Sequence, residues 1–414
     1  MGSGGANTVP LVLKGSDMSD TAQVQPLRVG LVGHSFMGRI HAQAWQTAPR
    51  FFELSRRPQL TTVCGRDAER ANQFAEAFGI GRVETDWRAL VNSPEIDVVD
   101  ICVPGDLHAP IAIAALEAGK HVLCEKPLAN TIAEAEAMAA AARTARSAGV
   151  RSMVGYSYRG TPAIAYARQL VNEGRLGTIR HIRAHYLQDG IVDENFPLVW
   201  RLQQEKAGSG ALGDIGSHLI DMAAFVTGQS LTSISALTET FVKHRPLPDS
   251  VDGLAATAGE GMGAVTVDDA AVFSGRTNAG ALATFEATRF ATGRKNAMRL
   301  EINGSGGSVS FDFENLNELW FHDHTLPAAE AGFRRIHVTE SEHPFLDAWW
   351  PPGHGLGYEH AFTHQAVVFA RAIGSGADPS PSFEDGLYVQ RVLSAVQASA
   401  SDGARLTPIS SVAD

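Results

Sequence analysis

The chain has few cysteines, and this scarcity bears on where the protein works. Three cysteines occur among 414 residues, Cys64, Cys102 and Cys124, and their spacing is not that of a metal site. All three lie in apolar, strand-like runs. A sparse, odd set of this kind is typical of a reducing compartment, where thiols act as small buried groups. We therefore expect a cytoplasmic protein.

Basic charge and long apolar runs are also lacking. Lys and Arg number 34 against 45 Asp and Glu, which gives a formal net charge of -11 at pH 7. A nucleic-acid surface needs clustered basic residues that displace counterions, so we expect no nucleic-acid partner. No apolar run has membrane-spanning length and no secretory signal pattern occurs, so we expect no membrane association.

The length and the changing apolar pattern predict two domains. A chain of 414 residues is long for one hydrophobic core. Residues 1–25 are rich in Gly, Ser, Thr and Gln without periodicity, and we expect a disordered tail there. We predict a dinucleotide-binding domain at 26–155. A domain for substrate binding and oligomerisation is predicted at 156–414, with C-terminal helices that pack back on the first domain.

The first domain alternates apolar runs with helical patterns. Runs rich in Val, Ile and Leu occur at 27–33, 59–65, 97–104 and 121–127, and helices are expected between them. Such an alternation indicates a parallel sheet covered on both faces. We therefore predict an α/β fold with an N-terminal domain of the Rossmann type.

The second domain shows a different pattern. Helices are expected at 162–173 and 211–226, and then strands of alternating polarity follow. The strands are expected at 178–189, 233–244, 267–277, 280–290, 296–305 and 307–313. Alternation of this kind predicts an α+β domain with a large, open, mainly antiparallel sheet. The Pro-, Gly- and Ala-rich segment 246–263 predicts a mobile loop, and helices return at 357–374 and 384–400.

A glycine-containing turn joins the first predicted strand to the first helix. Residues 33–38 read GHSFMG, close to the dinucleotide-binding pattern G-x-G-x-x-G, with Ser35 in the middle position. Gly33 permits the tight turn and Gly38 permits close packing of helix on strand. The helix N-terminus supplies N–H groups and partial positive charge for a pyrophosphate. The alternative is a tight turn without a ligand. The predicted cofactor contacts here are Gly33, Ser35, Phe36, Met37 and Gly38.

The residues after the second predicted strand bear on the choice between NAD and NADP. A carboxylate there binds the ribose 2′-hydroxyl of NAD, whereas an arginine accommodates the 2′-phosphate of NADP. The chain has Arg66 and Asp67 at this place. Arg66 can fork onto a phosphate, and Asp67 is better suited to cap the next helix. The residues favour NADP slightly over NAD, and a solvated Arg66 is the alternative.

Two further segments carry groups that move protons. Lys126, in the sequence CEKP, ends a predicted parallel strand, and ligands bind beyond the carboxyl ends of such strands. A lysine cation there can polarise a substrate oxygen. The segment 210–222 predicts a helix that carries Asp214 and His218 one turn apart. The alternatives are a surface pair of Lys126 with Glu125 and a histidine packed in the core.

Four motifs occur in the order typical of the Gfo/Idh/MocA oxidoreductase family. They are GLVGHSFMGRIHA, VPGDLH, EKPLA and GDIGSHLID, and the chain resembles the family from about residue 27 to 400. The second half, with YLQD, EATR, GRKN and PSFEDGL, is similar to the levoglucosan dehydrogenase-like, sugar 3-dehydrogenase branch. Ser35 replaces the middle glycine, and Gly105 stands where relatives usually have asparagine.

The resemblance implies a reaction and a set of site residues. Catalytic roles fall to Lys126, Asp214 and His218, and further cofactor contacts fall to Pro104, His108, Glu125 and Lys126. Hydride would pass from a secondary alcohol of a pyranose, often at C3, to nicotinamide. His218, with an ordinary pKa of about 6.5, would take the hydroxyl proton while Lys126 stabilises the oxygen. The resemblance also implies a homodimer or homotetramer formed through the C-terminal sheet.

Other polar residues lie at or just after predicted strand ends and suit a polyol. The predicted sugar contacts are Lys126, Tyr158, Arg159, Gln188, Asp189, Arg201, Asp214, His218 and Tyr358. His360 and His364 have a spacing that suits zinc, but no third ligand is evident, so we predict no metal.

Several alternative functions stay open at this point. An NADPH-dependent keto-sugar reductase would run the reaction in reverse, and an inositol dehydrogenase would act on a related ring. An NAD-dependent glycosidase and a non-catalytic dinucleotide sensor are weaker alternatives, because the chain keeps Lys126, Asp214 and His218 together.

Overall fold

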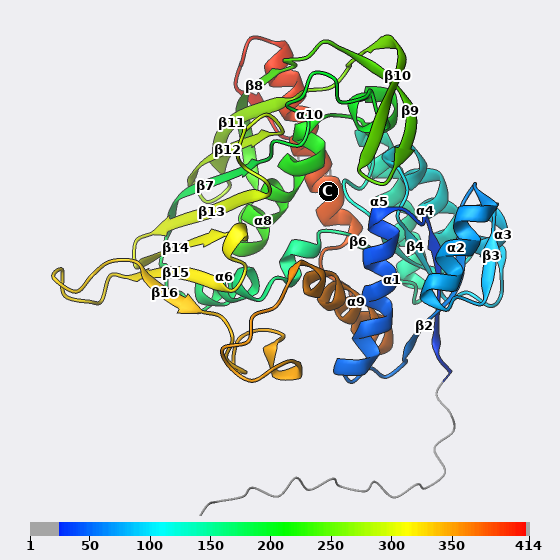
Figure 1. The fold of residues 1–414 in the computed structure, drawn as a ribbon. Helices are drawn as coiled ribbons and strands as arrows, with labels where there is room; N and C mark the ends of the chain where they lie inside the picture. Colours follow the sequence, from blue (N-terminus) through cyan, green and yellow to red (C-terminus); the bar gives the residue numbers. More distant parts are fainter. Residues whose placement is uncertain (1–24, 411–414) are drawn as a thin grey trace, which may run out of the picture.

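The structure is a computed structural model that describes residues 25–410, with two large sheets, a separate hairpin and surrounding helices (Figure 1). The disorder predicted for residues 1–25 concerns a segment that lies outside the described residues, except for Gln25. In the part that the structure describes, no helix is long and apolar enough to cross a lipid bilayer.

Six parallel strands form the first sheet, in the order β3-β2-β1-β4-β5-β6. They are β1 (Leu27–Val32), β2 (Pro58–Cys64), β3 (Arg82–Glu84), β4 (Val98–Ile101), β5 (His121–Cys124) and β6 (Ser152–Val154). The associated helices are α1 (Phe36–Phe51), α2 (Ala68–Phe78), α3 (Trp87–Asn92), α4 (His108–Glu117) and α5 (Ile132–Ser147). The strand order reverses between β1 and β4, which opens a crevice for a ligand at their carboxyl ends.

Nine strands form the second sheet, in the order β16-β15-β14-β13-β7-β12-β11-β8-β17. They are β7 (Ile179–Leu187), β8 (Leu231–Glu239), β11 (Ala270–Thr277), β12 (Leu282–Thr288), β13 (Ala297–Gly304), β14 (Gly307–Asp312), β15 (Glu318–Asp323), β16 (Arg334–His337) and β17 (Thr407–Pro408). Only β7 and β12 pair in parallel among these described strands. The predicted fold class, an α/β fold with a Rossmann-type domain and a large, mainly antiparallel sheet, is confirmed.

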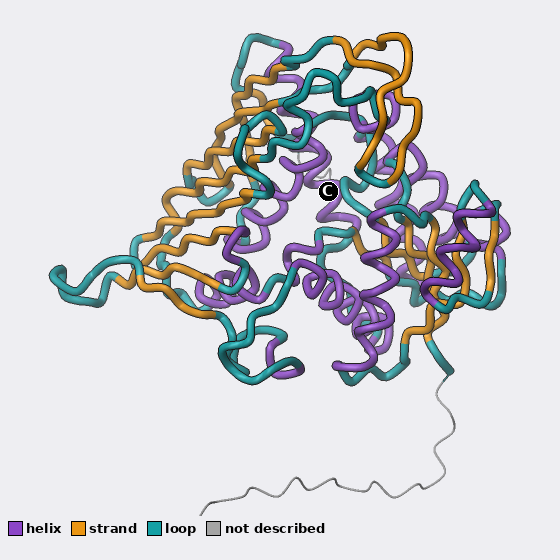
Figure 2. The backbone as a smooth tube through the Cα atoms, viewed as in Figure 1, coloured by secondary structure: helices purple, strands orange, loops and turns teal. Residues whose placement is uncertain are grey.

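Helices cover one face of the nine-stranded sheet, the face toward the first domain (Figure 2). They include α6 (Pro162–Asn172), α8 (Ser217–Thr227) and α10 (Phe383–Ser401). After the strands of the second sheet, the C-terminal helices return to the first domain. Helix α9 (Tyr358–Ser375) packs against α1, and α10 packs against both α5 and β8.

One local prediction is wrong and another needs refinement. Residues 246–263, predicted as a mobile loop, belong to an antiparallel hairpin of β9 (His244–Asp252) and β10 (Ala255–Ala264). Its small residues and prolines conceal the strand pattern, and the register is interrupted by irregularities near Ala258. The helix predicted at 211–226 is present, and its first part is a π-helical turn, η4 (Leu212–Gly216), that runs directly into α8.

Candidate active site

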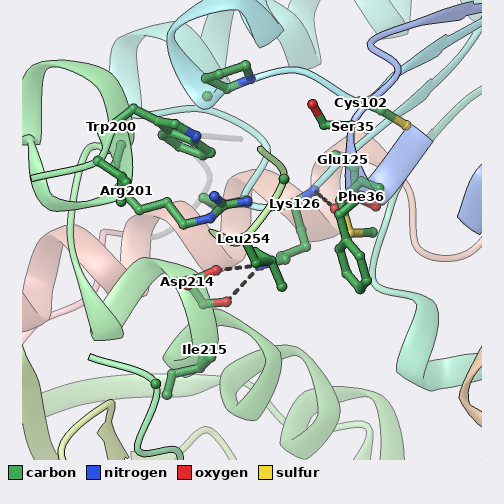
Figure 3. A pocket seen from close by; sticks show the side chains of 18 of the residues that line it. Ser35, Phe36, Cys102, Glu125, Lys126, Trp200, Arg201, Asp214, Ile215 and Leu254 are labelled. Carbon is green, nitrogen blue, oxygen red and sulfur yellow. Dashed lines mark hydrogen bonds and ion pairs between the residues drawn. The ribbon is translucent and has the colours of Figure 1, made fainter. Parts of the chain in front are cut away.

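A cavity of about 890 Å³ lies where the carboxyl ends of the parallel strands face the second domain. Most predicted site residues line it, namely Ser35, Phe36, Met37, Arg66, Pro104, His108, Glu125, Lys126, Tyr158, Gln188, Arg201, Asp214, His218 and Tyr358. Lys126 and Asp214 contact each other at the wall of this space, with Arg201 and Trp200 to one side and Phe36 to the other (Figure 3). The fold thus gathers one set of polar groups from both domains.

Lys126 forms the central contact of the site. It follows β5, and its Nζ donates hydrogen bonds to the main-chain oxygen of Asp214 at 2.8 Å and to the Asp214 Oδ1 at 3.1 Å. The two residues are 88 positions apart in the chain, and both line the cavity. The ammonium group is therefore held at the cavity wall, with its direction set by the second domain.

Three cations surround the Asp214 carboxylate. Besides Lys126, the Arg289 Nη1 lies 3.8 Å from Oδ2, and Arg201 also lines the cavity. Burial alone would raise the pKa of Asp214, but the positive charges of Lys126, Arg289 and Arg201 outweigh burial and hold this pKa well below its ordinary value. Asp214 is consequently a carboxylate at neutral pH that offsets part of the local positive charge.

His218 is buried beside this charge cluster. Its ring stacks on Tyr158, with centroids 4.3 Å apart and an interplanar angle of 20°. Burial, followed by the Lys126 charge, lowers the pKa of His218 well below its ordinary value, although Asp214 acts in the opposite direction. The imidazole is therefore neutral at physiological pH and has a lone pair available to accept a proton.

The start of the π-helical turn that carries Asp214 is held by a carboxylate from the second sheet's side of the domain. The Asp268 carboxylate, from the loop before β11, accepts hydrogen bonds from the main-chain N–H groups of Gly210 at 2.8 Å and Leu212 at 2.7 Å. It therefore satisfies donors that a helix start leaves unpaired. Burial raises the pKa of Asp268, and the hydrogen bonds from Leu212 and Gly210 oppose that effect. Asp268 thus orients the turn, a role that sequence reasoning missed.

The glycine turn fits a dinucleotide. Gly33 has φ +105°, and a Cβ there would collide with the main-chain oxygen of Cys102. A Cβ on Gly38 would collide with the main-chain oxygen of Gly33, so the start of α1 can approach β1 closely only without a side chain. Neither glycine is among the cavity-lining residues, so their roles are in packing, whereas Ser35, Phe36 and Met37 face the cavity. These residues can hold the pyrophosphate of a dinucleotide at the N-terminus of α1.

The remaining predicted cofactor residues differ in what they contact. Asp67 accepts a hydrogen bond from the main-chain N–H of Arg70 at 3.1 Å, which confirms it as the N-cap of α2. Arg66 lines the cavity at the same corner. His108 is buried, and its ring nitrogens lie 3.0 Å and 2.9 Å from the main-chain oxygens of Pro127 and Val103. It therefore braces the loop that contains Lys126.

Two predicted sugar contacts do not line the cavity. The Arg159 guanidinium donates to the buried Asp221 carboxylate at 3.0 Å and 3.1 Å, and to Asp385 at 3.3 Å. The Asp189 carboxylate accepts from Lys295 Nζ at 2.8 Å. The Arg159 charge is used in a buried pair and the Asp189 charge in an exposed one, so the structure does not bring either side chain into the cavity, contrary to the prediction.

Two polar residues that contact predicted sugar contacts, Tyr186 and Asn296, were not themselves predicted. The hydroxyls of Tyr158 and Tyr186 lie 2.8 Å apart, and Tyr186 donates to Asn296 at 2.7 Å. Gln188, a predicted contact, also donates to Asn296, at 2.8 Å. Tyr186 lies in β7 and Gln188 directly follows it, two positions along. The alternation of side chains along a strand, which puts both on one face, was the signal in the sequence that could have identified Tyr186.

The predicted pair of His360 and His364 is a separate case. The His364 Nε2 accepts from the Trp349 Nε1 at 2.7 Å, so this lone pair is not available to a metal.

Comparison with known proteins gives consistent matches along the chain. Residues 27–156 match an oxidoreductase family with an NAD-binding Rossmann fold, and residues 164–310 match the GFO/IDH/MocA C-terminal domain. Levoglucosan dehydrogenase of Pseudarthrobacter phenanthrenivorans is 41% identical over 382 residues, which cover 91% of this chain and 97% of that protein.

Solved structures agree with these matches. An oxidoreductase domain protein from Kribbella flavida is 57% identical, with a TM-score of 0.89, and the match covers 94% of this chain and 100% of that one. Levoglucosan dehydrogenase in complex with NADH and levoglucosan is 39% identical, with a TM-score of 0.87 and the same coverage.

Proposed function

Because this chain belongs to the Gfo/Idh/MocA oxidoreductase family and is related to sugar dehydrogenases acting on CH–OH donors, we propose that it oxidises a ring hydroxyl of a pyranose, glycoside or anhydrosugar. The candidate carbon is C3. The observation that carries the proposal is the convergence of Lys126, Asp214 and His218 on one cavity that also receives the N-terminus of α1.

The proposed chemistry divides the work between two side chains. When bound, NAD or NADP supplies the acceptor for the hydride that leaves the sugar carbon. The neutral His218 accepts the hydroxyl proton, so that the C–O bond becomes a carbonyl as the hydride departs. The Lys126 ammonium donates a hydrogen bond to the reacting oxygen and stabilises the negative charge that develops on it.

Asp214 has a positioning role in this scheme. Its contacts with Lys126 keep the ammonium turned toward the cavity, and its negative charge opposes the effect of Lys126 on the pKa of His218. Arg201, Gln188 and Tyr358 line the same space and are the proposed contacts for the other sugar hydroxyls.

For the cofactor we propose NAD or NADP, with a slight preference for NADP that comes from Arg66 as the contact for a 2′-phosphate. This proposal is supported by the place of Arg66 at the cavity after β2 and by the use of Asp67 as a helix cap. Replacing Arg66 by alanine should weaken NADP binding about tenfold and leave NAD binding within twofold, as measured by nucleotide titration. Equal losses for both nucleotides would contradict this role.

The function is tested with a panel of pyranoses, glycosides, anhydrosugars and inositols, each with NAD and with NADP. The expected result is that reduced nicotinamide, monitored by its absorbance, forms as a pyranose substrate is consumed. The Lys126→Met variant is the control for background reduction. The absence of turnover with every sugar, while both nucleotides still bind, would refute the proposal.

A second candidate is the reverse reaction, reduction of a keto-sugar by NADPH, which Arg66 favours. The rate of sugar oxidation is compared with the rate of reduction of the corresponding keto-sugar, and this comparison decides between a dehydrogenase and a reductase. If only the keto-sugar and NADPH react at a measurable rate, the enzyme is a reductase.

We also propose a homodimer or homotetramer that forms through the open face of the nine-stranded sheet. This face carries four exposed apolar side chains, Leu237, Val272, Leu282 and Trp320. Light scattering after size exclusion should give two or four copies, and Val272→Lys should reduce that number.

The buried thiols support our expectation that the protein works in the cytoplasm.

A further inference from the structure

The hairpin of β9 and β10 extends from the second domain toward the first, and within the described residues its two strands pair only with each other (Figure 1). A two-stranded hairpin is marginally stable without further support. It nevertheless exposes four large apolar side chains, with exposed fractions of 42% for Leu247, 39% for Val251, 56% for Leu254 and 61% for Met262. Those of the four that line a cavity are candidates for contact with a ligand bound there.

The base of the hairpin is firmly held. Arg245, with an exposed fraction of 0%, donates through its guanidinium to the main-chain oxygens of Ile191 at 2.7 Å and Asp193 at 2.7 Å. The main-chain N–H of Leu198 donates to Pro246 at 2.7 Å. The segment 190–203 and the hairpin base therefore form one unit, with its own small apolar core that includes Leu198 and Val265.

The hairpin tip, residues 248–254, reaches the same cavity as the glycine turn. Pro248, Val251, Gly253 and Leu254 line this cavity together with Arg66. The Arg70 guanidinium, from α2 of the first domain, lies 3.5 Å from the main-chain oxygen of Val251 as a hydrogen-bond donor. A segment of the second domain thus contacts the corner where β2 ends, the adenosine side of a Rossmann crevice.

We propose that the hairpin tip covers the adenosine and pyrophosphate half of the bound dinucleotide, with Val251 and Leu254 as its apolar contacts. This inference rests on the proposed function only in so far as that function needs a dinucleotide. The tip side chains are about half exposed and line the cavity together with Arg66 and Arg70 of the first domain. A bound nucleotide removes this apolar surface from water, which strengthens binding.

The test compares the double variant Val251→Ser, Leu254→Ser with Met262→Ser, a control on the same hairpin whose side chain is outside the cavity lining. NADH and ADP are titrated by fluorescence and calorimetry without any sugar. The tip variant should bind both NADH and ADP about tenfold more weakly, equivalent to about 1.4 kcal/mol, and the control should bind within twofold of the parent. Unchanged affinities, or a loss for NADH without a loss for ADP, would overturn the proposal.

Amide hydrogen exchange in the unmodified protein gives an independent readout. Exchange of residues 248–254 should slow when ADP is added, and unchanged exchange at saturating ADP contradicts the proposal. The two proposals fail in different ways. If nucleotide binding depends on the hairpin tip but no sugar is turned over, only the proposed function is refuted. If a sugar is turned over but nucleotide binding does not depend on the tip, only this inference is refuted.

Discussion

His41 lies between two buried carboxylates of the first domain, and replacing it by asparagine tests how this arrangement supports the site. The His41 Nδ1 lies 2.9 Å from the Asp100 Oδ2, and its Nε2 lies 3.0 Å from the Glu125 Oε1. Trp45 also donates to Asp100, at 2.7 Å. Glu125 in turn accepts from the main-chain N–H of Lys126 at 3.3 Å. The network thus extends from the middle of the sheet to the proposed catalytic lysine.

The charge state of His41 sets the size of the effect. Burial alone would lower the pKa of His41, but the Asp100 carboxylate outweighs burial and raises this pKa well above its ordinary value of 6.5. The ring is therefore an imidazolium that donates to both carboxylates. His41→Asn removes the positive charge and leaves the carboxylates buried, which should cost roughly 3–5 kcal/mol of the free energy of unfolding. The thermal midpoint should fall by about 5 °C, because the entropy of unfolding of a chain this long is large.

The pH dependence has a definite sign. Because the pKa of His41 is raised in the folded state, its stabilising contribution is fully present below pH 6.5, the ordinary value, and is lost as the pH rises through the folded-state pKa. The stability difference between the parent and His41→Asn should therefore be largest in mild acid and shrink in alkali. Calorimetric melts from about pH 5 to pH 10 measure this difference.

Trp45→Phe is the matched control, since it removes a neutral donor to the same Asp100 carboxylate. Trp45→Phe should lower the free energy of unfolding by about 1.5–3 kcal/mol, and this difference from the parent should not shrink in alkali. His41→Asn should also lower kcat about tenfold through the displaced Lys126, with nucleotide affinity unchanged. A His41→Asn protein as stable as the parent at every pH would refute the reasoning.

Three further predictions concern the site itself. Lys126→Met and His218→Asn should each lower kcat about 10²- to 10⁴-fold, and NADH titration of His218→Asn should give an affinity within twofold of the parent. Near-normal turnover in either variant would contradict the assignment. Because burial and Lys126 hold the pKa of His218 well below 6.5, the kcat of the parent should not change as the pH is lowered to 6.5. Lys126→Met removes one of the two effects that lower this pKa, so its residual activity should decline in acid at a higher pH than the activity of the parent. Arg159→Ala should leave the sugar KM unchanged but lower the thermal midpoint by several degrees, because Asp221 then lies buried without its partner; a raised KM with normal stability would restore Arg159 as a sugar contact.

Much of the first domain could be predicted because its signals are local. The turn at Gly33, the cap at Asp67 and the buried strands each depend on neighbouring residues. The hairpin of β9 and β10 could not be predicted in the same way. Its prolines and glycines are typical of a loop, and what organises its base is Arg245, whose partners lie more than 45 positions earlier in the chain.

The order of residues was enough to indicate a parallel sheet and to place Lys126 at its ligand-binding edge. Buried strands that alternate with helices run parallel, so their carboxyl ends lie at the same edge. The direction and partner of each charged side chain came from packing between distant segments. Lys126 meets Asp214 because the second domain brings a π-helical turn to it, and Arg159 turns from the cavity because Asp221, 62 positions away, is buried beside it. A charge removed from water must be compensated by whatever group the fold places next to it, and that neighbour is not encoded in the local pattern.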